Sequence, residues 1–145
     1  MSEEQVVVFR LENEEYCIPI NQVREIIHYT GATKLPASPA YFDGIINLRG
    51  KIIPVFDLAV KFKLQAKTGP RKALIVELDE TSLGIVVDEV SEVVRIQDSA
   101  IEAAPPQTAI GGTYIRGIGK QNGRLLILLE LRNLVDQEGA VKAAS

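Results

Sequence analysis

The 145-residue chain has few of the residues on which enzymes, metal sites and secreted proteins commonly depend. It has no tryptophan, a single histidine (His28) and a single cysteine (Cys17), so no internal disulfide is possible. One histidine and one cysteine cannot by themselves build a zinc site, and we expect no metal and no cofactor. We see no signal-peptide pattern and no apolar run near the roughly 20 residues of a membrane helix. These absences favour a protein of the cytoplasm, where thiols stay reduced.

The chain also lacks an excess of basic charge. It has 16 lysines and arginines against 19 aspartates and glutamates, a net charge of −3, and its pI is about 5.2. Proteins that bind nucleic acids usually carry a basic face. The one basic cluster, between residues 61 and 72, surrounds a Gly-Pro pair and is typical of a solvated linker. With 46% hydrophobic residues, the composition is that of a globular domain that needs no disulfide to fold.

What the sequence does contain is an internal repeat. Residues 44–58, GIINLRGKIIPVFDL, match residues 117–131, GIGKQNGRLLILLEL, with a shift of 73. Residues 21–29, NQVREIIHY, match residues 88–96, DEVSEVVRI, with a shift of 67. The difference of six falls in proline-containing connections, where insertions are tolerated. Glycine, charged and apolar positions coincide in both blocks, so the pattern indicates a duplication.

Short apolar segments separated by turns predict a chain made mainly of β-strands. The predicted strands are 6–11, 16–20, 23–28, 44–48, 52–56, 73–78, 83–87, 88–96, 115–118 and 124–129. Gly50 is placed where a tight hairpin turn needs a positive φ. Short helices are predicted at 57–62, with Asp57 as N-cap, and at 130–135. Proline pairs interrupt regular structure at 34–40 and 103–107.

Five short strands in each half of the chain can curl into a small barrel, which removes exposed sheet edges. We therefore predict a mainly all-β fold of two five-stranded barrels, related by a pseudo-two-fold axis, with a groove between them. The predicted domain is 5–138, the barrels are approximately 5–66 and 72–136, and 139–145 is a flexible tail.

The catalytic inventory is poor. Cys17 lies in an apolar alternation typical of a core residue, and His28 belongs to a different predicted strand, so the two form no local nucleophile–base pair. Acidic pairs stand at 14–15, 79–80 and 88–89, and two of them could serve a small hydrolytic enzyme if they met in a cleft. A nucleic-acid-binding double barrel is a second alternative, against which the acidic pI argues.

Arg49 is the exception in this inventory. It stands at a hairpin turn between two very apolar strands, and its guanidinium offers a planar set of donors that fits a carboxylate. Glu25, in the same half, is the nearest partner by pattern. The equivalent position in the second half is Asn122. An ordinary surface arginine remains an alternative, but the asymmetry predicts that the two halves meet different partners.

The motif residues resemble the CheW-like domain of bacterial chemotaxis proteins. The stretch GIINLRGKIIPVFDL is similar to the family's signature, EEYCIPINQVREI to its first hairpin and GIVVDEV to a strand of its second half. The resemblance covers roughly residues 5–136. It implies two SH3-like five-stranded barrels and a non-catalytic adaptor, a monomer in isolation, that couples transmembrane chemoreceptors to the histidine kinase CheA in membrane-associated arrays.

The resemblance also implies site residues. The receptor's cytoplasmic hairpin tip would dock in the groove between the barrels, on a side formed by Val23, Glu25, Gly44, Arg49, Val86 and Val87. An Arg49–Glu25 pair would shape this side. The regulatory domain of CheA would contact the first barrel, near the 29–39 connection and the 45–55 hairpin. The residues expected there are Ile45, Leu48, Ile53 and Val55. The resemblance implies no nucleic acid, no membrane insertion and no small-molecule substrate.

Overall fold

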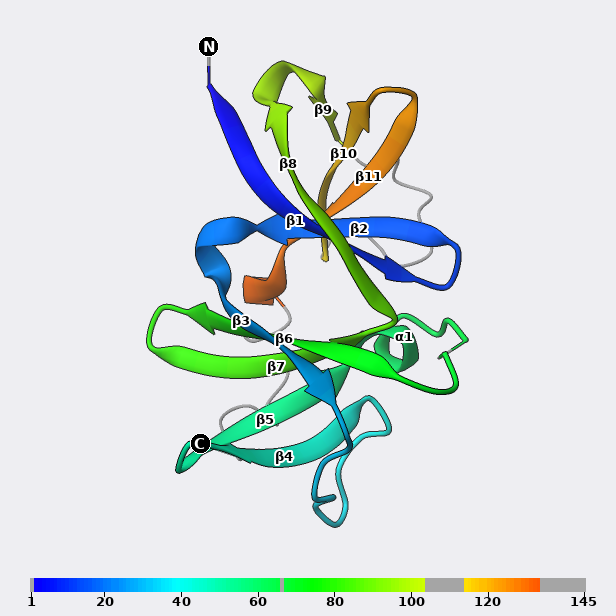
Figure 1. The fold of residues 1–145 in the computed structure, drawn as a ribbon. Coiled ribbons are helices and arrows are strands. Elements are labelled where there is room, and N and C mark those ends of the chain that lie inside the picture. The colour runs from blue at the N-terminus through cyan, green and yellow to red at the C-terminus, as the bar shows by residue number, and fades with distance from the viewer. Residues whose placement is uncertain (1, 66, 104–113, 134–145) are drawn as a thin grey trace.

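The computed structural model describes residues 2–65, 67–103 and 114–133, and within them the chain is almost entirely β-structure (Figure 1). The elements in chain order are β1 (Glu3–Leu11), β2 (Glu14–Pro19), η1 (Ile20–Gln22), β3 (Val23–Tyr29), β4 (Phe42–Leu48), β5 (Lys51–Asp57), α1 (Leu58–Lys61), β6 (Arg71–Leu78), β7 (Thr81–Val87), β8 (Glu89–Gln97), η2 (Asp98–Ala100), β9 (Ile101–Glu102), β10 (Ile115–Gln121) and β11 (Arg124–Leu129). The predicted strands are confirmed, and the two-residue strand β9 was not predicted. None of the described helices has the length and apolar character needed to cross a membrane.

The hairpin turns show why the repeat has its particular residues. In the β4–β5 turn Arg49 has a φ of +53° and Gly50 a φ of +87°, and in the β10–β11 turn Asn122 and Gly123 have +51° and +78°. Two consecutive residues with positive φ form the tight turn whose twist suits a β-hairpin. The predicted conformation of Gly50 is confirmed. Arg49 is the first of the two residues in the turn at the tip of the β4–β5 hairpin.

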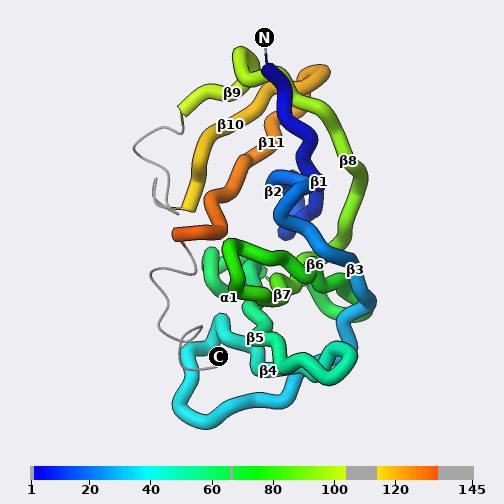
Figure 2. Tube along the Cα trace, turned by 90° about the vertical axis from the view of Figure 1, so that its left-hand side faces the viewer, coloured from blue at the N-terminus to red at the C-terminus, as the bar shows by residue number. Residues whose placement is uncertain are grey.

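The strands form two antiparallel-rich sheets that exchange strands between the halves of the chain. The first sheet has the order β8-β1-β2-β11-β10-β9 and the second β3-β6-β7-β5-β4. The first sheet takes the β1–β2 hairpin from the first half of the chain and four strands from the second half, and the second sheet takes the β6–β7 hairpin from the second half and three strands from the first. In each sheet a parallel pair joins the two sets, β2 with β11 and β5 with β7. Figure 2 shows β1 and β2 in the same lobe as β8, β10 and β11.

This exchange corrects the predicted internal boundary. The ranges 5–66 and 72–136 follow the sequence repeat, whereas each sheet contains strands from both ranges. The first hairpin therefore crosses to the lobe of the second half. The predicted fold class, two SH3-like barrels related by duplication, is confirmed.

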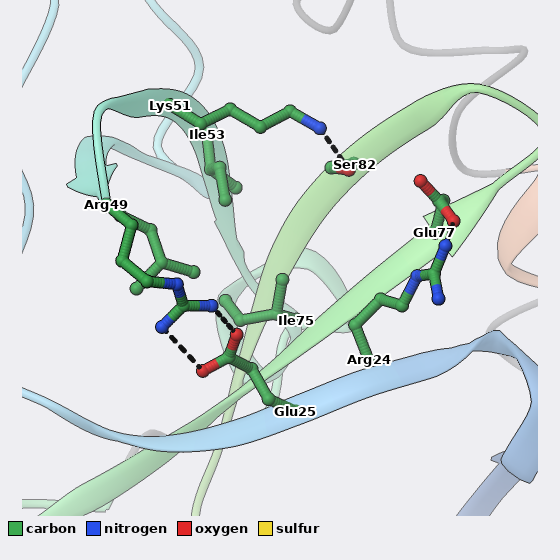
Figure 3. Close-up of a pocket in the computed structure, with 9 residues that line it drawn as sticks. Arg24, Glu25, Arg49, Lys51, Ile53, Ile75, Glu77 and Ser82 are labelled. Carbon is green, nitrogen blue, oxygen red and sulfur yellow. Dashed lines mark hydrogen bonds and ion pairs between the residues drawn. The ribbon is translucent and has the colours of Figure 1, made fainter.

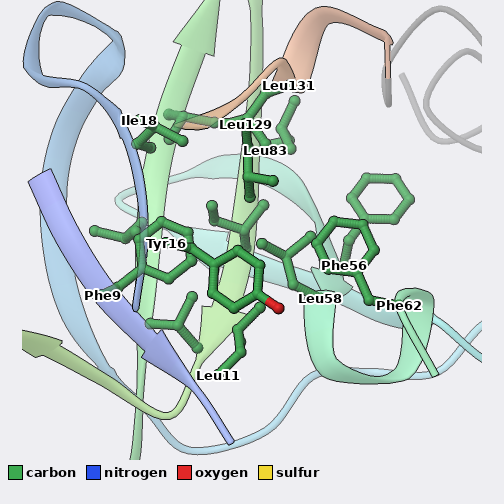
Figure 4. Packing of buried hydrophobic residues seen from close by; sticks show 14 of the residues in the cluster. Phe9, Leu11, Tyr16, Ile18, Phe56, Leu58, Phe62, Leu83, Leu129 and Leu131 are labelled. Carbon is green, nitrogen blue, oxygen red and sulfur yellow. The ribbon is translucent and has the colours of Figure 1, made fainter. Parts of the chain in front are cut away.

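The main core lies between the two sheets. Its large side chains include Phe9, Phe56, Leu58 and Leu83, and Tyr16 stacks between Phe9 and Phe62 (Figure 4). A second cluster fills the interior of the first sheet and consists of Val6, Val8, Cys17, Ile96, Leu126 and Leu128. Cys17 is fully buried, as predicted, and burial raises its pKa to about 12.

Helix α1 begins where the sequence predicts. The Asp57 carboxylate accepts a hydrogen bond from the backbone N–H of Val60 at 3.3 Å and thereby caps the helix. The same carboxylate accepts a 2.8 Å bond from Arg71, and both side chains are largely buried. The predicted second helix begins at Leu131 and is described only to Asn133. The remainder of that helix, most of the 103–107 break and the 139–145 tail lie outside the described residues.

Candidate functional site

The predicted Arg49–Glu25 pair is present, and it links two edges of the second sheet. Arg49 projects from the β4–β5 turn and donates two hydrogen bonds to the Glu25 carboxylate on β3, one of them 3.4 Å long (Figure 3). The Arg49 side chain is 70% exposed and that of Glu25 is 30% exposed. The hydrogen bond to Glu25 raises the pKa of Arg49, so the guanidinium stays charged at any physiological pH.

Beside this pair lies a pocket of about 440 Å³ between β3 and the β4–β5 hairpin. Its lining residues are Arg24, Glu25, Leu48, Arg49, Lys51, Ile53, Ile75, Glu77 and Ser82. Every lining residue belongs to the second sheet or its β4–β5 turn. The pocket therefore differs in position from the groove between the barrels that the family resemblance implies. We call it the second-sheet pocket.

The second-sheet pocket has an apolar floor and a charged rim. Ile53 and Ile75, which are buried, form the floor. On the rim, Arg24 forms an ion pair with Glu77, and the Lys51 ammonium donates a 3.0 Å hydrogen bond to the hydroxyl of Ser82 (Figure 3). Such a combination suits the binding of an amphipathic side chain from another protein: the floor removes apolar area from water while the rim orients polar groups.

The other residues predicted on the receptor side are less exposed. Val23 is half-buried against the main core. Gly44 is buried with a φ of +141°, and a Cβ at this position would lie 2.3 Å from the carbonyl oxygen of Thr33. Gly44 thus has a structural reason to be glycine, because only glycine lets β4 approach the Thr33 backbone so closely.

Val86 and Val87 are almost completely buried, with 0% and 1% of their areas exposed. Strand alternation turns them to opposite faces of the sheet, and Val87 packs in the main core between the sheets. The structure does not bring either valine to the Arg49–Glu25 pair. The prediction that both line an open groove is therefore not supported by their positions.

The residues predicted to contact the kinase are also divided. Ile53 and Val55 are buried, whereas Ile45 and Leu48 are partly exposed. Leu48 and Ile53 line the second-sheet pocket, so they lie beside Arg49 and not on a separate face. The sequence placed them on one hairpin correctly, but it could not tell which side chains of that hairpin point inward.

The equivalent position in the first sheet is occupied by an ion-pair cluster. Arg124 donates hydrogen bonds of 3.1 and 2.8 Å to Glu15 on β2 and one of 2.9 Å to Glu92 on β8. By the repeat shifts, Glu92 is the counterpart of Glu25, Arg124 of Lys51 and Glu15 of Ser82. The hydrogen bond from Arg124 lowers the pKa of Glu15 below its ordinary value of 4.5. No sequence motif singles out Lys51, Ser82 or this cluster, although the repeat shifts of 67 and 73 align their positions.

The described part of the chain has few groups suited to catalysis or metal binding. Among residues 2–65, 67–103 and 114–133, no three histidine, cysteine or acidic side chains are grouped to hold a metal ion. His28, on β3, has an exposed side chain close to the Lys72 ammonium, with 3.1 Å between Nδ1 and Nζ. The Cys17 thiol is buried in the first sheet.

Comparisons with known proteins agree with the sequence motifs. The model of the CheW-like domain matches residues 5–139. The chain is 35% identical to a chemotaxis protein CheW of Klebsiella aerogenes, over 93% of this chain and 83% of that protein, and 32% identical to a chemotaxis protein CheW of Helicobacter pylori, over 92% and 82%. The crystal structure of the scaffolding protein TtCheW of Thermoanaerobacter tengcongensis superposes with a TM-score of 0.84 and 37% identity, covering 90% of each chain.

Proposed function

Because this chain belongs to the CheW-like family of chemotaxis scaffold proteins, which are not enzymes, we propose that it couples chemoreceptors to the histidine kinase CheA. In this proposal it binds the cytoplasmic hairpin tip of a receptor and the regulatory domain of the kinase, in the cytoplasm at receptor arrays. The observation that carries the receptor part is the exposed Arg49–Glu25 pair beside an apolar-floored pocket. Membership of a non-catalytic family removes the alternative of a small hydrolytic enzyme.

The receptor-binding surface that we propose is centred on Arg49 and Glu25. A receptor tip is a helical hairpin, and a helix docks by placing apolar side chains in hollows while charged groups fix its register. Val23 and Gly44 support this surface from below, since Val23 packs on the core and Gly44 holds β4 in place. Val86 and Val87 are left out because a buried valine offers no contact area to a partner.

For the kinase we propose a contact area around Ile45, on the outer side of the second sheet. Ile45 and Ile46 line a shallow hollow of about 390 Å³ next to the 30–33 segment. Ile26 and Ile52, on β3 and β5, are among the large hydrophobic side chains that remain exposed. Exposed apolar side chains on a folded surface are typical of a contact area for another protein. In kinase binding, the buried Ile53 and Val55 would act only by maintaining the shape of the β4–β5 hairpin.

The test is a titration of the protein, and of its R49A variant, against a purified receptor tip fragment and a purified CheA regulatory domain. We expect R49A to weaken receptor binding at least tenfold, because it leaves the Glu25 carboxylate without its partner, and to leave kinase binding and thermal unfolding unchanged. R95A is the matched control, since Arg95 is an exposed arginine in an ion pair with Glu3 on the first sheet. Receptor binding by R49A equal to that of the parent would contradict the assigned surface.

A further inference from the structure

The first sheet has an oppositely charged pair at a position where the second sheet has only the cation. In the first sheet, the Glu15 carboxylate on β2 is held by Arg124 at the start of β11. In the second sheet, the repeat places Ser82 where Glu15 would be and Lys51 where Arg124 would be. The cation is retained, but the carboxylate is replaced by a short hydroxyl.

Among the described residues, Lys51 is also the one cation on the rim of the second-sheet pocket that has no carboxylate partner. Of the three basic side chains that line the described pocket, Arg24 is paired with Glu77 and Arg49 with Glu25. The Lys51 ammonium donates a 3.0 Å hydrogen bond to the Ser82 hydroxyl, and its side chain extends over the pocket toward β7 (Figure 3). With three cations and two carboxylates, the rim has an excess of one positive charge.

We propose that the second-sheet pocket binds an acidic side chain of the partner, whose carboxylate contacts Lys51 and Ser82 as Glu15 contacts Arg124 in the first sheet. This inference rests on the proposed function, and it names the acidic side chain as one carried by the receptor tip. Lys51 would donate a charge-assisted hydrogen bond and Ser82 a neutral one. Ile53 and Ile75 would contact the apolar stem of the bound residue.

The second-sheet pocket is complementary in charge to a carboxylate and has a volume of about 440 Å³. Arg24 and Arg49 are each neutralised by a glutamate, so the charge of Lys51 is left unbalanced. This charge would repel a second cation and attract an anion. A carboxylate there would be enclosed by protein on the floor and would lie within reach of a donor from each of two strands. Such contacts fix the register of a docked helix and speed encounter more than they raise affinity in general.

The first test places a carboxylate of the chain itself in the pocket by substitution. In S82E, a glutamate replaces Ser82 at the position of Glu15, and we expect it to occupy the pocket, contact Lys51 and weaken binding of the receptor tip fragment at least tenfold. S91E is the matched control, because Ser91 is an exposed serine on β8 and the variant makes the same change in charge. Circular dichroism and thermal unfolding check that both variants fold.

Glu77 lies directly across from Ser82 in the β6–β7 pairing, so the new glutamate in S82E faces a like charge that could destabilise the fold. A second variant, K51M, makes the test independent of this effect. K51M should weaken receptor binding about fivefold and reduce its salt dependence. Each acidic residue of the receptor tip is then replaced by its amide. One of these replacements should weaken binding to the parent protein but not to K51M. If the parent binds the tip and both K51M and S82E bind it as tightly as the parent does, the proposed carboxylate site is wrong. If the parent does not bind the tip at all, the proposed function is wrong and this inference falls with it.

Discussion

The open sides of the two sheets are built from equivalent strands but have different contents. In the first sheet a three-residue cluster, Glu15, Glu92 and Arg124, joins β2, β8 and β11 across the opening. In the second sheet Arg49 joins β3 to the β4–β5 turn, and a pocket of about 440 Å³ remains beside it. In one copy of the duplicated unit this position is occupied by an ion-pair cluster of the chain's own side chains, and in the other copy a pocket remains there.

The interiors of the two sheets also differ at two equivalent positions. Val6 and Cys17, which fill the interior of the first sheet, correspond by the repeat to Ala73 and Gly84 in the second. At these two positions the second sheet has the smaller residue, and Ile53 and Ile75 form the floor of its pocket. A duplicated chain can divide its tasks in this way, because the stability supplied by one copy permits an incompletely filled site in the other.

The largest effect that we expect tests the difference in filling. Leu126 in the first sheet and Ile53 in the second are equivalent by the repeat, and both are buried. L126A should lower the free energy of unfolding by about 4 kcal/mol and I53A by about 2 kcal/mol, because a cavity next to an open pocket costs fewer contacts. Urea unfolding of both variants measures the difference. Equal losses would mean that the two interiors are equally well packed.

A smaller effect should distinguish two equivalent glycines. An added Cβ at Gly44 would meet the Thr33 carbonyl oxygen at 2.3 Å with φ at +141°, while at Gly117 it would meet Ile101 Cγ2 at 2.7 Å and the Glu102 carbonyl oxygen at 2.9 Å without a positive φ. G44A should therefore cost about 3 kcal/mol and G117A about 1 kcal/mol, since only the former combines a backbone clash with strained φ. Thermal unfolding gives both values, and a larger loss in G117A would contradict the expected order.

The smallest effect concerns pH and the cluster that closes the first sheet. The pKa of Glu15 is lowered in the folded protein by its bond to Arg124, so the folded state binds fewer protons than the unfolded state below pH 4.5. The stabilisation is present above pH 4.5 and is lost as the pH falls through the lower pKa of the folded state. E15Q should remove about 1 kcal/mol at pH 7.

The control for this comparison is S82Q in the other sheet, where no carboxylate is present at the equivalent position. The loss in E15Q should shrink as the pH falls below 4.5, whereas S82Q should differ from the parent by the same amount at every pH. A pH-independent loss in E15Q would mean that Glu15 contributes by packing and not by charge.

Much of the local structure follows from the sequence alone. Apolar alternation placed the ten longer strands, and glycine at the turns and the Asp57 cap were identified because their chemistry is local. The Arg49–Glu25 pair was also anticipated, through the resemblance to a family signature. The repeat shifts already contained the equivalence of Lys51 with Arg124, but a sequence alignment does not indicate that the difference leaves a pocket.

The sequence by itself determined which segments form strands and that the chain is a duplication, because side-chain alternation and turn chemistry act between neighbouring residues. Only the tertiary structure decided which strands pair, since backbone donors and acceptors are the same in every strand and allow the β1–β2 hairpin to join either half. It also decided that Val86 and Val87 are buried and that Lys51 faces Ser82 over a pocket. Those outcomes depend on how two curled sheets pack around a shared core, which involves residues far apart in the chain.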